Sequence, residues 1–193
     1  MCLIPRNEKR ITLEGNQANI EIPKGKTRSI YPLGDSFDLT GYVDVDYAYF
    51  LVDCKSRSGM ARFLGSALIS WGTKKQNSVS MSTADAEYVV VSSCCVQLLL
   101  IKQQLKDSCV FTDIVSLICN NTSVMNMAKN PVQHKRTKYK HVRHHFLSDN
   151  VEKQNVKMKF CKTKDQLADI LTKPLRKEFF VKYRIRYGTH KIT

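Results

Sequence analysis

The sequence has no CxxC pair, although it contains seven cysteines, and it has no internal repeat or low-complexity tract. An odd number of cysteines without paired spacing predicts reduced thiols and excludes a small disulfide-stapled scaffold. A zinc site that joins Cys161 to His141, His144 or His145 has a spacing unlike known zinc patterns and is disfavoured.

Long apolar runs are also missing. The longest apolar stretch, residues 88–101, is interrupted by Ser92, Ser93 and Gln97, and it is shorter than the roughly 20 residues that cross a bilayer. The first ten residues, MCLIPRNEKR, lack the apolar core of a signal peptide. We therefore expect an intracellular protein, located in the cytoplasm or nucleus, with no membrane partner.

Acidic residues are scarce. The 31 Lys and Arg outnumber the 17 Asp and Glu, which gives a formal net charge of +14 and favours nucleic acid as the partner. The stretch from Ile114 to Ser148 contains no acid at all. Its basic side chains form either a phosphate-tracking surface or a solvated helix face, and the candidate phosphate contacts are Lys135, Arg136, Lys138, Lys140 and Arg143.

Residues 82–106 predict one long buried helix. Helical steps from Glu87 meet an unbroken apolar stripe of Val91, Cys94, Leu98, Ile101 and Leu105. Ser82 and Asp85 fit a capping box that fixes the start of this helix. Glu87 then lies on the buried face, where it either leans out and pairs with a basic side chain or serves as a metal-binding or catalytic acid.

Two further acids share one face of a strand expected within residues 37–49. Val43 and Val45 alternate there with Asp44 and Asp46. The pattern fits a solvated acidic face on an edge strand, and it equally fits a carboxylate cluster that faces a cation.

The remaining pattern predicts a mixed sheet with helices packed against it. We expect a poorly structured N-terminal segment at residues 1–35, one domain at residues 36–175 and a basic tail at residues 176–193. The expected elements are a hairpin within 60–71 that turns near Gly65 and Ser66, strands at 113–119 and 156–160, helices at 123–129 and 137–151, and a helical turn at 165–171.

Four motifs, in this order across residues 41–175, carry a specific resemblance. They are GYVDVDYA, then KSRSGMARFLGSALISWGTKKQNSVSMSTADAEYVVVS, then NPVQHKRTKYKHVRHHF, then TKDQLADILTKPL. The chain resembles the RNase H domain at the C-terminal end of copia-type retrotransposon Pol polyproteins. The resemblance implies an α/β, RNase H-like fold with a five-stranded mixed sheet flanked by helices. It also implies a fragment or decayed copy that lacks the reverse transcriptase portion of Pol.

The same resemblance implies a nuclease that holds two Mg²⁺ ions and hydrolyses the RNA strand of an RNA–DNA hybrid. The metal ligands of the family match Asp44, Glu87 and Asp169, and Asp46 lies beside Asp44 without an assigned role. Asn120 stands where the family has an aspartate, and its amide lacks the negative charge of a carboxylate. We therefore expect weak or absent cleavage. The alternative is a catalytically inactive nucleic-acid-binding module or a non-functional retrotransposon remnant.

Overall fold

A computed structural model describes residues 10–14, 17–21, 38–50, 52, 54–107, 112, 115–129 and 138–187, with backbone only for 10–14, 17–21, 50 and 138–144. Its main feature is a five-stranded sheet with the strand order β5-β4-β3-β6-β7. The strands are β3 (Leu39–Phe50), β4 (Lys55–Leu64), β5 (Ala67–Lys75), β6 (Val115–Cys119) and β7 (Val156–Phe160).

The sheet is mixed. Strand β4 pairs antiparallel with both β3 and β5, whereas β6 pairs parallel to β3 and β7 pairs parallel to β6. The turn between β4 and β5 passes through Gly65, whose φ of 58° lies in the left-handed region that glycine adopts without strain. The predicted hairpin turn is therefore confirmed, and so is the five-stranded mixed sheet.

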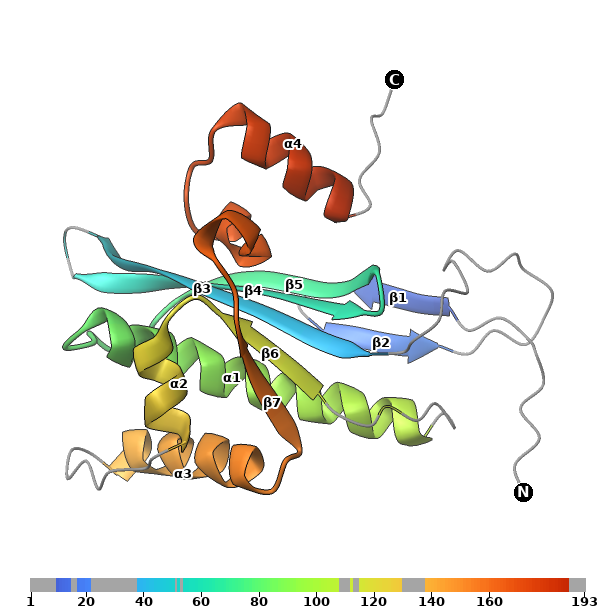
Figure 1. The fold of residues 1–193 in the computed structure, drawn as a ribbon, viewed down its shortest axis with the longest axis horizontal. Coiled ribbons are helices and arrows are strands. Elements are labelled where there is room, and N and C mark those ends of the chain that lie inside the picture. The colour runs from blue at the N-terminus through green and yellow to red at the C-terminus, as the bar shows by residue number, and fades with distance from the viewer. Residues whose placement is uncertain are drawn as a thin grey trace.

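One face of the sheet is covered by the long helix α1 (Thr83–Asp107), with α2 (Thr122–Lys129) and α3 (Lys138–Glu152) beyond it (Figure 1). The apolar stripe predicted on α1 is buried along its whole length against the sheet. By length and mean hydropathy alone this helix would also be able to cross a membrane. Its packing against the sheet explains the same apolar composition.

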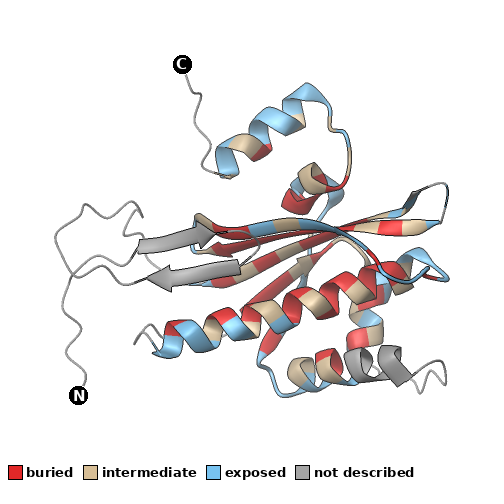
Figure 2. Ribbon diagram, turned by 180° about the vertical axis from the view of Figure 1, so that it is seen from behind, coloured by how far each residue is buried: buried red, intermediate tan, exposed pale blue. Residues whose placement is uncertain are grey.

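The opposite face carries the chain after β7. It forms the short 3₁₀ helices η1 (Thr163–Asp165) and η2 (Leu167–Leu171), and then α4 (Lys177–Arg186), which lies above the sheet in Figure 1. A second, smaller cluster of buried side chains fills this side, made by Ala61, Phe63, Leu167 and Tyr183. Figure 2 shows that buried residues concentrate on the sheet and on the helix faces turned toward it.

Both ends of the described chain contain regular structure. Strands β1 (Arg10–Glu14) and β2 (Gln17–Glu21) form a separate two-stranded antiparallel sheet within the segment expected to be poorly structured. Helix α4 lies within the expected basic tail, and its Tyr183 is buried against the η2 side of the sheet. The domain boundaries at residues 35 and 175 stay predictions.

Candidate active site

The central strand β3 positions Asp44 by simple alternation. Val43 and Val45 point toward α1 and join its core, so Asp44 points to the opposite face, where η2 packs. Only 2% of Asp44 is exposed. The predicted alternation of Val43 and Val45 with Asp44 is confirmed, and it places the carboxylate of Asp44 in a buried position. Asp46, two residues further along, is partly exposed and lies opposite Arg57 of β4 in the antiparallel register.

The η2 helix brings Asp169 to the same place. Gln166 fixes this helix to the sheet because its side-chain amide donates a hydrogen bond of 2.9 Å to the carbonyl oxygen of Val43. Gly59, which pairs with Asp44 in the sheet, allows the close approach. A Cβ atom on Gly59 would lie 2.6 Å from the Thr172 methyl group and 3.0 Å from Cβ of Leu171. A side chain at residue 59 would therefore push η2 away from the sheet.

Lys173 joins the two carboxylates. Its ammonium group lies 3.0 Å from each carboxylate oxygen of Asp44 and 3.5 Å from Oδ1 of Asp169. The hydroxyl of Thr172 donates a further hydrogen bond to Oδ2 of Asp44. Burial and the adjacent charge of Asp44 raise the pKa of Asp169 from 3.8 to about 7, while Lys173 opposes that rise. The buried carboxylates of Asp44 and Asp169 therefore both contact the ammonium group of Lys173.

Glu87 enters the region from the start of α1, where the predicted cap is present. The backbone N–H of Asp85 donates to Oγ of Ser82 at 3.1 Å, and the Asp85 carboxylate accepts from the N–H of Met81 at 3.2 Å. Glu87 is 8% exposed. Burial raises its pKa, the side-chain amide of Asn121 lowers it by hydrogen bonding, and the charge of Asp44 raises it further.

A buried polar network holds the chain just before this helix. The Gln76 amide donates to the carbonyl oxygen of Ala86 at 2.9 Å and to Oγ of Ser58 at 3.0 Å, and it accepts from Oγ of Ser80 at 3.2 Å. Because Ala86 directly precedes Glu87, these bonds tie the position of the helix start to strand β4. Composition and periodicity gave no signal for Gln76, since a lone glutamine in a polar loop is unremarkable.

Two adjacent asparagines in the loop after β6 have different surroundings. Asn120 is partly buried and stands at the position predicted to have lost a metal ligand. Asn121, next to it, bonds the Glu87 carboxylate, and its Oδ1 accepts a 2.9 Å hydrogen bond from the backbone N–H of Ser123 at the start of α2. Sequence reasoning did not assign Asn121 a place in the site. It also did not place Thr172 or Lys173 beside the acids, although both lie in the last of the four motifs.

The three predicted acids thus meet only in part. Asp44 and Asp169 share Lys173, and Glu87 lies near enough to Asp44 and Lys173 for their charges to shift its pKa. Within the residues that the structure describes, no three His, Cys, Asp or Glu side chains are grouped closely enough to hold one metal ion. The donor set of Asp44 and Asp169 suits a hard divalent cation, because carboxylate oxygens are the ligands that Mg²⁺ prefers.

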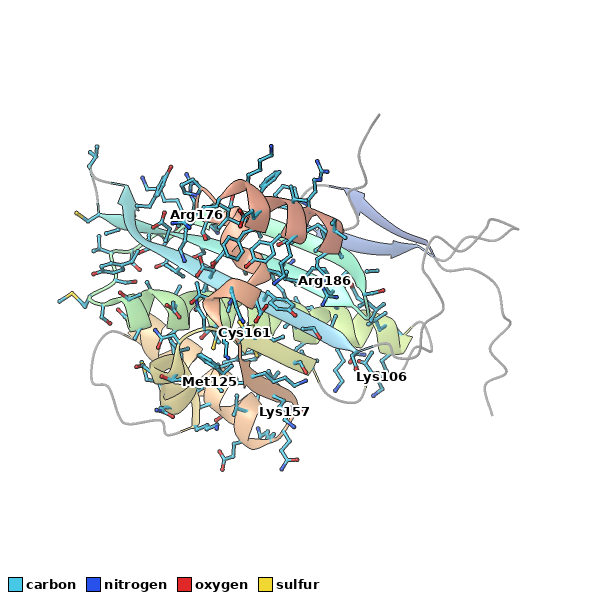
Figure 3. The ribbon with its side chains drawn as sticks, turned by 45° about the horizontal axis from the view of Figure 1, so that its top comes forward. Lys106, Met125, Lys157, Cys161, Arg176 and Arg186 are labelled. Carbon is cyan, nitrogen blue, oxygen red and sulfur yellow. The ribbon has the colours of Figure 1, made fainter. Side chains whose placement is uncertain are left out.

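Thiols adjoin the acids at the ends of β6 and β7. Cys161, labelled in Figure 3, follows β7, and its backbone N–H donates to the carbonyl oxygen of Cys119 at 3.0 Å. Burial raises the pKa of Cys119 to about 11 and that of Cys161 to about 12, and the nearby acids contribute to both shifts. The described cysteines are free thiols, as the sequence predicted for this part of the chain.

The predicted nucleic-acid contacts fall mostly outside what the structure describes. Lys135 and Arg136 precede α3 and lie outside the described residues, and for Lys138, Lys140 and Arg143 only the backbone of α3 is described. Their assignment to phosphate binding stays a prediction. Figure 3 labels two other arginines, Arg176 and Arg186, at the two ends of α4.

Comparison with known proteins adds two findings about the fold. The LC11-RNase H1 isolated from compost by a metagenomic approach matches 70% of this chain and 93% of its own, with a TM-score of 0.53 and 12% identity. The N-terminal RNase H domain of Rv2228c from Mycobacterium tuberculosis matches 71% of this chain and 91% of its own, with a TM-score of 0.50 and 8% identity. The protein therefore has the RNase H fold.

Sequence comparison shows which group of proteins with this fold the chain belongs to. The retrovirus-related Pol polyproteins from transposons RE1 and RE2 of Arabidopsis thaliana are 31% and 32% identical to this chain over 160 residues, which is 82% of its length. The Pol polyprotein from transposon TNT 1-94 of Nicotiana tabacum is 29% identical over 152 residues. The chain spans about 11% of the length of each. No protein-family model matches the sequence. The chain belongs to the RNase H-like domains of retrovirus-related Pol polyproteins.

Proposed function

We propose that this chain is the RNase H-like domain of a copia-type element, that it binds RNA–DNA hybrid in the cytoplasm or nucleus, and that it cleaves the RNA strand weakly or not at all. The pairing of Asp44 with Asp169 supports the proposal most directly. These acids come from residues 125 positions apart (169 minus 44), and both are buried beside one cation. Burying two carboxylates next to each other lowers the stability of the folded protein. A nuclease site that binds Mg²⁺ requires such a pair, which accounts for its presence here.

The chain's own residues suggest how the site would work. Asp44 and Asp169 would hold one Mg²⁺, and Glu87 would contribute to a second position together with the loop after β6. Bound magnesium supplies positive charge next to the scissile phosphate. Thr172 and Gly59 keep the acid pair in place, the first by its hydrogen bond to Asp44 and the second by leaving room for η2.

Asn120 is the reason for expecting impaired cleavage. An amide oxygen can coordinate a metal ion, but it carries no negative charge with which to offset the charge of a second cation. The amide of Asn121 hydrogen-bonds Glu87, so that acid already has a neutral partner. A second metal position here would therefore contain one carboxylate fewer than the family pattern implies.

A hybrid-cleavage assay tests this function. A labelled RNA–DNA hybrid is incubated with the protein in Mg²⁺ or Mn²⁺, beside the variant Asn120→Asp. We expect little cleavage by the natural chain and an increase of about a hundredfold or more in the variant, because metal charge stabilisation contributes several kcal/mol. Asp44→Asn in the Asn120→Asp background serves as the control and should abolish the gain.

Two results would change the proposal. Rapid cleavage by the natural chain would show that Asn120 is no impairment. If Asn120→Asp cleaves no faster, while hybrid binding measured by fluorescence anisotropy is tight and salt-dependent, the second candidate function applies, namely a catalytically inactive nucleic-acid-binding module. The net charge of +14 favours that second candidate.

A further inference from the structure

Lys173 directly contacts both members of the buried acid pair. Its ammonium nitrogen is 3.0 Å from both carboxylate oxygens of Asp44 and 3.5 Å from Asp169, so a single positive charge faces two buried acids. Both acids are buried. The ammonium group therefore stands where a divalent cation shared by the two carboxylates would have to bind.

The backbone around Lys173 is fixed, but its side chain has access to solvent. The N–H of Lys173 donates to the carbonyl oxygen of Asp169 at 2.9 Å, and Thr172 is held to Asp44 through its hydroxyl. The lysine side chain itself is 37% exposed, in contrast to the 2% and 6% of the two acids. It can thus leave the acid pair by rotation of its own flexible stem, without any rearrangement of η2 or the sheet.

An ammonium group and a divalent ion cannot both occupy this pair. Ammonium contacts carboxylates at about 3 Å, whereas Mg²⁺ requires oxygen ligands at roughly 2.1 Å in octahedral geometry. Two cations between the same oxygens would also repel each other strongly in a buried setting. Metal binding and the Lys173 contact are therefore mutually exclusive.

We propose that Lys173 is a built-in counter-cation for the acid pair, and that a divalent metal ion enters the site by exchange with its ammonium group. In the metal-free protein Lys173 compensates Asp44 and Asp169; in the metal-bound protein it is released to solvent. The inference rests on the proposed function only in that both concern the same acid pair. It requires that the pair binds a divalent cation, and it does not require cleavage.

Calorimetric titration with MnCl₂, without nucleic acid, tests the exchange. Lys173→Met removes the charge and keeps a flexible side chain of similar reach. We expect it to bind Mn²⁺ about tenfold more tightly than the natural chain. This value corresponds to a natural chain in which Lys173 leaves the acid pair free in about one molecule in ten, since apparent affinity falls in proportion to that fraction. Asp44→Asn combined with Lys173→Met should abolish this tight binding, which places the ion at the acid pair.

Lys182→Met is the matched control. Lys182 also pairs with an aspartate, at 3.1 Å from Asp165, but that pair is exposed and contains one acid only. The control removes the same unit of charge and should leave Mn²⁺ affinity unchanged. Equal tightening in both variants would show a general effect of net charge and would overturn the proposal, as would unchanged affinity in Lys173→Met.

A second measurement uses the natural chain and covers the case in which Lys173→Met does not fold. Amine acylation followed by mass spectrometry reports how accessible each lysine is. Acylation of Lys173 should accelerate when saturating Mg²⁺ is added, whereas that of Lys182 should not. An unchanged Lys173 rate at a metal concentration that calorimetry shows to be saturating would overturn the exchange.

The two proposals fail separately. If Lys173→Met binds Mn²⁺ more tightly while neither it nor Asn120→Asp cleaves hybrid, the exchange stands and the nuclease function falls. If Asn120→Asp cleaves hybrid but removal of Lys173 leaves metal affinity unchanged, the nuclease function stands and the exchange falls.

Discussion

The acid pair of Asp44 and Asp169 and the single acid Glu87 lie in one region of the fold, but they are compensated differently. The pair faces the ammonium group of Lys173, whereas Glu87 accepts a hydrogen bond from the neutral amide of Asn121. Burial is the largest cause of the raised pKa of both Asp169 and Glu87. One buried carboxylate can be held by a dipole, but two adjacent carboxylates require a positive charge or a proton.

The difference indicates where a metal ion would stabilise the protein most. At the acid pair an ion would replace an existing cation and add a second positive charge. At Glu87 it would have to compete with a hydrogen bond to an amide, at a position where residue 120 contributes no charge.

In metal-free buffer, the free energy of unfolding should depend on pH because Asp169 is buried beside Asp44. The pKa of Asp169 in the folded protein is about 7 against an ordinary value of 3.8. The folded state then binds more protons than the unfolded state between these values, so this group's contribution is greatest below about pH 4 and is lost as pH rises to about 7. The loss in unfolding free energy is at most about 4 kcal/mol, and urea unfolding in EDTA at stepped pH measures it.

Other groups titrate in the same range, and the control removes only this one. Asp169→Asn has no carboxyl at this position, so subtracting its stability curve from that of the natural chain isolates the contribution of Asp169. The difference should decline with rising pH. A difference that is flat, or that rises with pH, would show that Asp169 is not held in its protonated form by the pair.

A substitution that pushes η2 away from β3, and so separates Asp169 from Asp44, should have the next largest effect on stability. Gly59→Val places a side chain where Thr172 and Leu171 lie within 3.0 Å of the new Cβ atom. We expect a loss of about 3 kcal/mol, since overpacking at a close contact forces the backbone to move. NMR titration should also find the pKa of Asp169 lower than in the natural chain, because η2 lifts and its acid gains solvent.

Gly41→Ala serves as the comparison for that variant. A Cβ atom at Gly41 would meet Leu98 at 2.7 Å and Cys94 at 2.9 Å, on the α1 face of the sheet. This variant should be destabilised while Asp169 keeps its raised pKa. If the pKa of Asp169 falls equally in both variants, the shift follows from general loosening and not from the distance between η2 and β3.

Local patterns were enough to predict much of this arrangement. The period of the apolar residues after Glu87 gave the buried face of α1, and the Ser82 cap gave its start, because both depend on neighbouring residues only. The alternation of Val43 and Asp44 likewise gave the two faces of β3. The four motifs then led to the five-stranded mixed sheet, which periodicity alone cannot supply, although the strand order came only from the structure.

What escaped prediction depends on contacts between distant segments. Lys173 reaches Asp44 across 129 positions of sequence, and Gly59 matters only because η2 packs over it. The choice between Asn120 and Asn121 depends on how the chain turns after β6, which no periodic pattern specifies. Strands β1 and β2 were missed for a different reason: they pair locally with each other, but their segment is polar and interrupted by Gly15.

A smaller effect is expected from neutralising one member of the pair. Asp44→Asn keeps an acceptor for Thr172 but removes a charge from the ion pair, while Lys173 retains Asp169. We expect a loss of about 2 kcal/mol by urea unfolding, less than for a buried pair left with no partner. Asp46→Asn alters a partly exposed acid on the same strand face and should cost under about 0.5 kcal/mol. Equal costs would mean that burial of the pair contributes nothing.

The smallest change in stability is expected at Glu87. Glu87→Gln keeps an oxygen that accepts from Asn121 and removes a charge that burial disfavours, so unfolding free energy should change by less than about 1 kcal/mol. In the Asn120→Asp background the same substitution should lower hybrid cleavage about a hundredfold, because a metal ligand loses its charge. If Glu87→Gln instead destabilises the protein as much as Asp44→Asn, then Glu87 also depends on a cation, and the amide of Asn121 is not its main partner.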